Sequence, residues 1–153
     1  MKTCCFTGHR MVPSADALRL RAALSETIES LYQEGVKDFI CGGAIGFDTL
    51  AAKAVLEKRK TKADIRLLLA IPCRNQFERW NESQKAVYHA ILEEADGVEY
   101  LAETYDRGCM LRRNRYMVDH ADVCVAFYNG SARGGTAFTV NYAYQSGIRV
   151  ILL

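Results

Sequence analysis

Apolar positions along this chain follow two alternating patterns, one typical of β-strands and one typical of α-helices. Compact β-prone or aliphatic runs predict strands near residues 2–6, 38–41, 65–71, 97–101, 122–127 and 148–153. Between these runs, apolar residues recur at spacings of three and four, which places them on one face of a helix. Helices are predicted from about residue 17 to Gly35, from the segment 42–48 to residue 60, over about 79–94, within 110–120, and from Gly134 to about Gln145.

The alternation of strands and helices predicts a parallel sheet of the α/β class. Residues 65–71 are almost continuously aliphatic, as strands covered by helices on both faces usually are. Because crossovers between parallel strands are right-handed, the helices should form a layer on each face of the sheet. We therefore expect a single Rossmann-like α/β domain over residues 1–153, with three layers and a mostly parallel sheet in the strand order 3-2-1-4-5-6.

Composition narrows the class of protein. The 153 residues are 50% hydrophobic and carry 20 Lys and Arg against 18 Asp and Glu, a net charge of +2. This balance does not support general binding to nucleic acids or membranes, although a local anion site stays open. No apolar run approaches the roughly 20 residues that a bilayer requires, and residues 1–6 lack the pattern of a signal peptide. We expect a cytoplasmic location and no membrane partner.

Cysteine and histidine positions favour neither a disulfide framework nor a metal site. The six cysteines are at positions 4, 5, 41, 73, 109 and 124. Most lie in apolar runs and none forms a C-x-x-C pair, so we expect buried, reduced thiols. The histidines at positions 9, 89 and 120 are far apart in sequence, whereas zinc requires clustered ligands. No metal and no cofactor is predicted.

Polar or glycine-rich segments follow the predicted strands, where parallel sheets bind ligands. The site of such a sheet lies outside the carboxyl ends of its strands, at the switch point beside strand 1. Glycines there let backbone N–H groups approach an anion, and a helix N-terminus adds partial positive charge. The candidate ligand-binding residues in these segments are Thr7, Gly8, His9, Arg10, Gly42, Gly43, Gly46, Asp48, Arg113, Asn114, Asn129, Gly134, Gly135 and Thr136. Two glycine-rich helix starts favour phosphate as the anion.

Arginines and the connection after strand 3 extend this set. Arg10 and Arg113 are expected to give phosphate selectivity, because a guanidinium offers a planar fork that complements phosphate oxygens. Gln76 and Trp80 follow Pro72 and are candidates for the border of the pocket. Packing of Trp80 between helix and sheet is an equally good interpretation.

Most of the candidates also have a structural interpretation. The glycines of the segment 42–46 serve equally well to make a bend, and Asp48 is in position to cap a helix. For His9, a role in stabilising its turn is as good an interpretation as a contact with a ligand. The arginines of the segment 112–115 cannot all face one site, because neighbouring helical residues point in different directions. Convergence of four polar segments on one edge is what favours a ligand site.

Several motifs together resemble the YpsA-like (DUF1273) family. They are Phe-Thr-Gly-His-Arg at 6–10, the segment 42–51, Pro72 with Gln76, Arg79 and Trp80, the segment 108–122, and Gly-Gly-Thr at 134–136 followed by Thr139 and Val140. The resemblance covers nearly the whole chain. That bacterial family belongs to the SLOG superfamily of Rossmann-like proteins, with the DNA-processing protein DprA and the LOG-type phosphoribohydrolases. The resemblance implies a nucleotide or nucleic-acid derivative as ligand.

The likeness to the LOG-type enzymes breaks at one position. Their Arg-Lys pair falls on Arg113 and Asn114, and their Gly-Gly-x-Gly-Thr-x-Glu motif overlaps Gly135 and Thr136, but Phe138 occupies the position of the catalytic Glu. Phenylalanine cannot act as a general acid or base or stabilise an oxocarbenium ion. Hydrolysis by the LOG mechanism is therefore not expected, and no catalytic residue is assigned.

Two hypotheses follow, from different functional classes. We expect a sensor or binding module for a nucleotide-like small molecule. The alternative is a hydrolase or transferase that acts on a nucleotide derivative through Asp48, His9 or another acidic residue. Single-stranded DNA binding, as in DprA, is a third and less favoured function. The sequence leaves the oligomeric state open, with a homodimer among the options.

Overall fold

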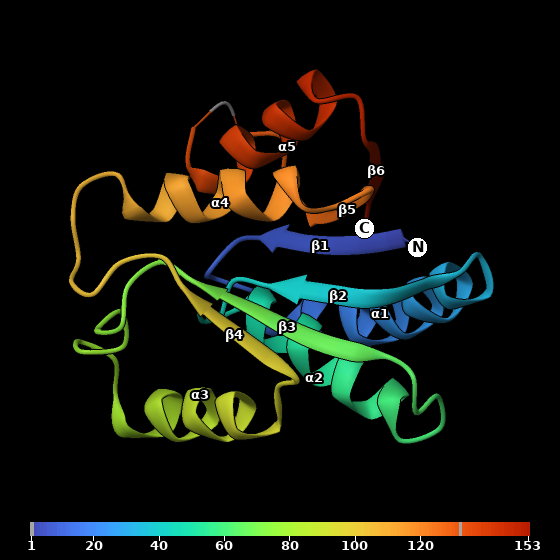
Figure 1. Cartoon of the computed structure of the whole chain (residues 1–153), viewed down its shortest axis with the longest axis horizontal. Helices are drawn as coiled ribbons and strands as arrows, with labels where there is room; N and C mark the ends of the chain where they lie inside the picture. Colours follow the sequence, from blue (N-terminus) through green and yellow to red (C-terminus); the bar gives the residue numbers. More distant parts are fainter. Residues whose placement is uncertain (1, 132) are drawn as a thin grey trace.

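Within residues 2–131 and 133–153, which the computed structural model describes, six parallel strands form one sheet with helices on both faces (Figure 1). The elements are β1 (Lys2–Gly8), α1 (Ser14–Gln33), β2 (Val36–Cys41), α2 (Phe47–Arg59), β3 (Arg66–Ile71), α3 (Glu82–Glu94), β4 (Gly97–Tyr100), α4 (Cys109–Asp119), β5 (Val123–Phe127), α5 (Gly135–Gln145) and β6 (Arg149–Leu152). Helices α1, α2 and α3 cover one face, and α4 and α5 cover the other. The predicted three-layer α/β fold is confirmed, with every strand pair parallel.

The strand order is 4-3-2-1-5-6, so the predicted order 3-2-1-4-5-6 is wrong in the position of strand 4. β4 pairs with β3 at the edge of the sheet, and β5 takes the place beside β1. β4 has four residues and exposes Glu99, which suits an edge strand rather than a strand covered on both faces. β5 is almost entirely buried. The switch point of the sheet therefore lies between β1 and β5.

Side chains of β1 enter the core on both faces of the sheet, because successive residues of a strand point in opposite directions. Cys4 and Phe6 pack toward α1, α2 and α3, and Cys5 packs toward α4 and α5. Phe6 stacks on Phe39 of β2 with ring centroids 6.1 Å apart. All six cysteines are buried with free thiols, as predicted. This packing fixes the position of the carboxyl end of β1 and therefore of the segment 7–10.

Two element boundaries differ from the prediction near the candidate site. β1 runs to Gly8, which pairs with Phe127 of β5, so Thr7 and Gly8 are strand residues. α3 begins at Glu82 rather than near residue 79, because Asn81 and Gln84 form a reciprocal capping box. The connection from β3 to α3 is correspondingly longer, and Trp80 lies in it.

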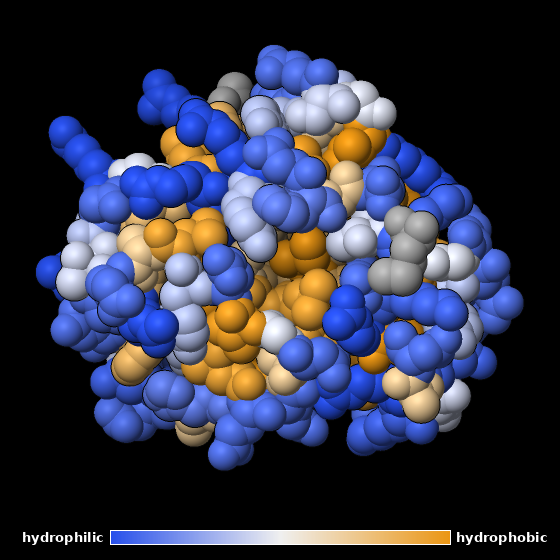
Figure 2. Space-filling view, viewed as in Figure 1, coloured by the Kyte–Doolittle hydropathy of each residue, from blue (hydrophilic) through white to orange (hydrophobic). Residues whose placement is uncertain are grey.

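No helix in the described part of the chain is both long enough and apolar enough to cross a membrane. Among the same residues, no group of three or more His, Cys, Asp or Glu side chains is placed to hold a metal ion. In the face shown in Figure 2, polar side chains cover most of the area, and apolar side chains are exposed near its centre.

Candidate functional site

The loop after β2 needs glycine at two positions because of its backbone geometry. Gly46 has a φ of 79°, and a Cβ there would come within 2.2 Å of the Arg10 carbonyl oxygen. Gly43 has a φ of 70°, which residues with a side chain rarely adopt. The Phe47 N–H donates to the His9 carbonyl at 3.1 Å. These glycines therefore do shape the turn, and the turn brings the N-terminus of α2 beside the loop after β1.

Asp48 lies in the first turn of α2, and only 7% of its surface is exposed. Its Oδ2 accepts a hydrogen bond from the Ala44 N–H at 3.1 Å. The carboxylate thus closes the preceding loop instead of capping its own helix, whose N-cap is Gly46. Burial raises the pKa of Asp48, and the positive charge of Arg113 opposes that shift. Asp48 borders the site as a carboxyl group with an increased tendency to hold a proton.

Arg113 reaches from α4 to the carboxyl ends of β2 and β3, and 5% of its surface is exposed. Its guanidinium donates to the Gly42 carbonyl, to the Ala70 carbonyl at 3.5 Å, and through Nε to Asn114 Oδ1 at 2.9 Å. A Cβ on Gly42 would come within 2.6 Å of the guanidinium. Burial lowers the pKa of Arg113, and the negative charge of Asp48 opposes the shift. Arg113 therefore connects α4 to the carboxyl ends of β2 and β3 through hydrogen bonds.

His9 connects the loop after β1 to the loop after β5. Its Nε2 accepts a hydrogen bond from the Asn129 N–H at 3.1 Å, and its ring packs edge-on against Phe127 with centroids 5.6 Å apart. The Asn129 side chain accepts from the Ser131 N–H at 2.9 Å. These contacts support the structural interpretation of His9, and they hold its loop against the segment that leads into α5.

Residues from both sides of the switch point line a cavity of about 350 Å³, which we call the polar cavity. Of the predicted site residues it contains Thr7, Gly8, His9, Arg10, Asp48, Arg113, Asn114, Gly134, Gly135 and Thr136. Gly134, the N-cap residue of α5, lies here with a φ of 100°, and no side chain among the described residues caps the helix start. The loops after β1 and β5 therefore meet α4 in one place, as the prediction required.

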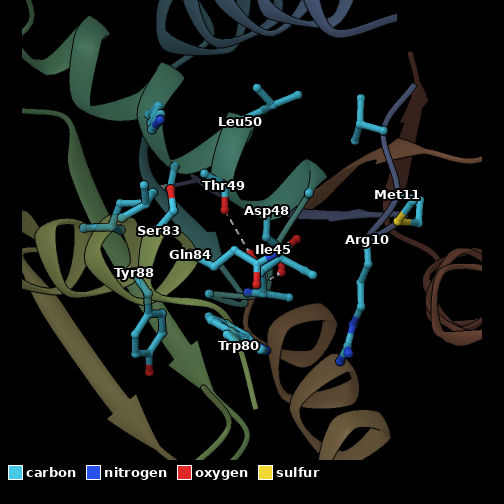
Figure 3. Close-up of a pocket in the computed structure, with 18 of the residues that line it drawn as sticks. Arg10, Met11, Ile45, Asp48, Thr49, Leu50, Trp80, Ser83, Gln84 and Tyr88 are labelled. Carbon is cyan, nitrogen blue, oxygen red and sulfur yellow. Dashed lines mark hydrogen bonds between the residues drawn. The ribbon is translucent and has the colours of Figure 1, made fainter. Parts of the chain in front are cut away.

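A second cavity of about 450 Å³, which we call the apolar cavity, lies between the loop after β1, α2 and α3 (Figure 3). Gly43, Gly46 and Trp80 of the predicted set line it. Arg10, Ala44 and Asp48 line both cavities. Most of the other residues that line it were not among the candidates predicted from the sequence; they include Met11, Ile45, Thr49, Leu50, Ser83, Gln84, Val87 and Tyr88. The spacing of Ser83, Gln84 and Val87 on one helix face was the available signal.

Gly42, Gln76 and Asn129 line neither cavity. Gln76 instead donates through Nε2 to the Gly43 carbonyl at 3.3 Å. In the described residues, Gln76 Oε1 and the Tyr88 hydroxyl are buried without a hydrogen-bond partner. Burial also raises the pKa of Tyr88. Gln76 therefore holds the loop after β2 through the Gly43 carbonyl and does not line either cavity.

The charge around the polar cavity is positive. Arg10 and Arg113 are its two cations, and Asp48 is its one carboxylate among the described residues. Arg10 is exposed, and its guanidinium contacts the Met110 sulfur at 3.6 Å. A guanidinium has five N–H donors, so Arg10 retains donors for an anion. Arg113 is already engaged with protein carbonyls.

A Rossmann-like α/β sheet with glycine-rich helix starts at its switch point defines the class of this protein. The family model YpsA, described as the YspA SLOG family, matches residues 13–149, and this chain belongs to that family. The resemblance drawn from its motifs is thus confirmed.

Two curated bacterial proteins illustrate the relationship. The uncharacterized SPbeta prophage-derived protein YoqJ of Bacillus subtilis is 33% identical over 142 residues, which cover 84% of this chain and 82% of YoqJ. UPF0398 protein BH1768 of Halalkalibacterium halodurans is 29% identical over 126 residues, which cover 81% of this chain and 67% of that protein.

Solved structures share the fold at low sequence identity. DNA processing protein A (DprA) from Streptococcus pneumoniae has a TM-score of 0.68 at 15% identity, over 99% of this chain and 50% of its own. DprA from Helicobacter pylori, studied for its single-stranded DNA binding mode, has a TM-score of 0.69 at 17% identity, over 99% of this chain and 64% of its own. The protein TM1055 has a TM-score of 0.62 at 21% identity, over 98% and 72%. These likenesses concern the fold.

Proposed function

We propose that this protein binds a nucleotide-like ligand through its phosphate group in the polar cavity and acts as a sensor or binding module. The observation that carries the proposal is that the start of α5 at Gly134–Thr136 and the guanidinium of Arg10 line the same cavity. A helix N-terminus supplies N–H donors and partial positive charge to an anion. A guanidinium adds a planar pair of donors that matches phosphate.

Further features support a small organic phosphate as the ligand. Ligand cavities typically measure about 300–1,000 Å³, and the polar cavity, at about 350 Å³, is within that range. Thr7, Asn114 and Thr136 add hydroxyl and amide groups to its lining. The chain's membership in a SLOG family and the single-stranded DNA binding named for a DprA of the same fold favour a nucleotide-derived ligand.

Binding without turnover is favoured by what replaces the catalytic glutamate of the LOG-type enzymes. Phe138 stacks on Tyr142 with ring centroids 5.9 Å apart, and the Arg115 guanidinium lies 5.3 Å from the Phe138 centroid. Neither neighbour supplies a carboxylate to stabilise positive charge on a ribose. α5 therefore contributes donors to the polar cavity but no general acid or base at that position.

A hydrolase or transferase is the second candidate function, and Asp48 is the observation that favours it. It is a buried carboxyl group at the junction of the two cavities, and burial raises its pKa. Such a group can act as a general acid or base nearer neutral pH than an ordinary aspartate. Release of free base from a nucleotide would separate this function from binding.

Thermal unfolding with inorganic phosphate, ribose 5-phosphate and AMP tests the proposal. AMP at roughly 100 times its dissociation constant should add about 2.7 kcal/mol to the free energy of unfolding. Arg10→Ala should weaken ligand binding by about 1–3 kcal/mol, the scale of a charge-assisted hydrogen bond. Arg149→Ala is the matched control, because Arg149 is also exposed but pairs with Glu34 at 2.8 Å. It should leave the affinity unchanged.

Chromatography of the same samples distinguishes the two candidate functions. Intact AMP with thermal stabilisation supports a binding module, and rapid release of adenine identifies the enzyme instead. Absence of stabilisation by every phosphate compound, or equal affinities in Arg10→Ala and wild type, contradicts the phosphate site.

A further inference from the structure

The apolar cavity adjoins the polar cavity, and the two meet at a defined place. Arg10, Ala44 and Asp48 line both. Figure 3 shows Ser83 and Tyr88 of α3 on one side of the apolar cavity and Arg10 on the other, with Asp48 between them. A molecule with its phosphate at the start of α5 could therefore extend past Asp48 into the apolar cavity.

The lining of the apolar cavity suits a flat aromatic group. Trp80 is half-buried at its wall and packs edge-on against Tyr88, with ring centroids 5.3 Å apart and an interplanar angle of 85°. Ile45, Leu50 and Val87 supply aliphatic surface. Stacking of a nucleic-acid base on an aromatic side chain contributes about 1–3 kcal/mol.

Polar groups at this cavity distinguish a heteroaromatic base from a purely aliphatic occupant. Ser83 and Lys53 are exposed and line the cavity, so a hydroxyl and an ammonium are available at its rim. Thr49 is half-buried, and its hydroxyl donates to the Ala44 carbonyl at 3.2 Å. A hydrophobic cavity with a few polar groups is the usual form of a site that orients a small molecule.

We propose that the apolar cavity holds the heteroaromatic base of the same ligand, so that the ligand is a nucleotide lying across both cavities with its sugar beside Arg10 and Asp48. This inference rests on the proposed function for the phosphate end. It adds the chemistry of the other end, and it assigns a base-recognition role to Trp80 and to the cavity-facing side of α3.

Fluorescence of Trp80 reports directly on this cavity, because Trp80 is the only tryptophan in the sequence. Purine and pyrimidine nucleoside monophosphates, the nucleoside adenosine, ribose 5-phosphate and inorganic phosphate are titrated separately. Calorimetry on the same solutions measures affinity. At least one nucleotide should quench Trp80 emission saturably and bind about tenfold tighter than ribose 5-phosphate, which should bind without changing the emission.

A variant that fills the apolar cavity provides the second arm. Val87→Phe places a ring in the cavity and should reduce the affinity for that nucleotide to about that of ribose 5-phosphate. Binding of ribose 5-phosphate should be unchanged, which also verifies that the variant folds. Ala86→Phe is the matched control, since Ala86 is an exposed neighbour on α3 outside the cavity. It should bind nucleotide as wild type does.

The outcomes separate this inference from the proposed function. If ribose 5-phosphate binds and no nucleotide binds more tightly or changes Trp80 emission, the base site is wrong and the phosphate site stands. If adenosine quenches Trp80 while neither phosphate nor ribose 5-phosphate binds, the base site stands and the phosphate site is wrong. Equal nucleotide affinities in Val87→Phe and wild type also overturn the base site.

Discussion

Arg113 and Asp48 are buried charges of opposite sign beneath the candidate site. Burial lowers the pKa of Arg113 and raises that of Asp48, and in each case the other residue opposes the shift. Removing one member of such an arrangement is costly, because the other charge and its hydrogen-bond partners stay buried. At the scale of single residues, Arg113 was predicted to contact a ligand, but its hydrogen bonds hold the edge of the sheet together.

Arg113→Met should therefore destabilise the protein by about 3 kcal/mol, because it leaves the Gly42 carbonyl unpaired and Asp48 without its compensating charge. Arg112→Met is the control on the same helix, since Arg112 is exposed and pairs with Asp106 at 2.9 Å. Its loss should cost less than about 1 kcal/mol. Urea unfolding of both variants measures the difference, and similar losses would contradict a structural role for Arg113.

At the scale of elements, the sequence predicted which segments are strands and helices but not where each strand lies in the sheet. Apolar periodicity indicates which side chains of a segment are buried, as it does for β5, but it does not indicate which strand lies next to it in the sheet. The short β4 with exposed Glu99 was placed beside β1, although its pattern suits an edge. In the predicted strand order, α3 would not lie beside α2. The apolar cavity, which depends on α2 and α3 lying side by side, was missed for this reason.

The polar cavity was predicted more fully, because it depends on a simpler rule. All strands are parallel, so the segments that follow β1, β2 and β5 meet at one edge whatever the order of the outer strands. The roles within the site were harder to predict. His9 accepts a hydrogen bond from the Asn129 N–H, and Arg113 donates to backbone carbonyls. Apolar periodicity does not encode such contacts.

Gly46 connects the loops after β1 and β2, and substitution there tests how closely the two elements are coupled. Gly46→Ala should cost more than about 2 kcal/mol, because it combines a positive φ with a clash against the Arg10 carbonyl. Gly147→Ala is the matched control, with a φ of 77° and no atom within 4 Å of the added Cβ. It should cost about 1 kcal/mol.

Urea unfolding of the two glycine variants gives both values directly. The difference between them reports the clash with the Arg10 carbonyl together with the cost of the ψ of −124° that Gly46 adopts. Equal destabilisation would mean that the loop after β1 moves aside at little cost. The junction of the two cavities would then not be rigid.

At the scale of the whole molecule, charge is distributed in local pairs. The net charge is +2, and several basic side chains on the surface are engaged with carboxylates. Examples are Lys58 with Glu29 at 3.3 Å, Arg59 with Asp96 at 2.6 Å, and Arg66 with Asp38 at 2.8 Å. Binding along a nucleic-acid backbone instead uses a continuous positive groove. These pairs favour a local anion site over an extended groove for a single strand.

Single-stranded DNA should accordingly bind weakly and with little dependence on salt. A protein that neutralises six to ten phosphates loses about 10³–10⁵-fold in affinity between roughly 50 and 200 mM salt. Arg10 is the one exposed arginine among the described residues of the polar cavity, so about one phosphate contact and about a threefold loss are expected over that range.

Fluorescence anisotropy of a labelled oligothymidine, measured across this salt range, gives both the affinity and the slope. Nucleotide binding under the same conditions is the reference, because it uses the same polar cavity. Tight oligonucleotide binding with a steep slope would show that the chain uses an extended surface. The two cavities would then be one end of a nucleic-acid groove rather than a site for a small molecule.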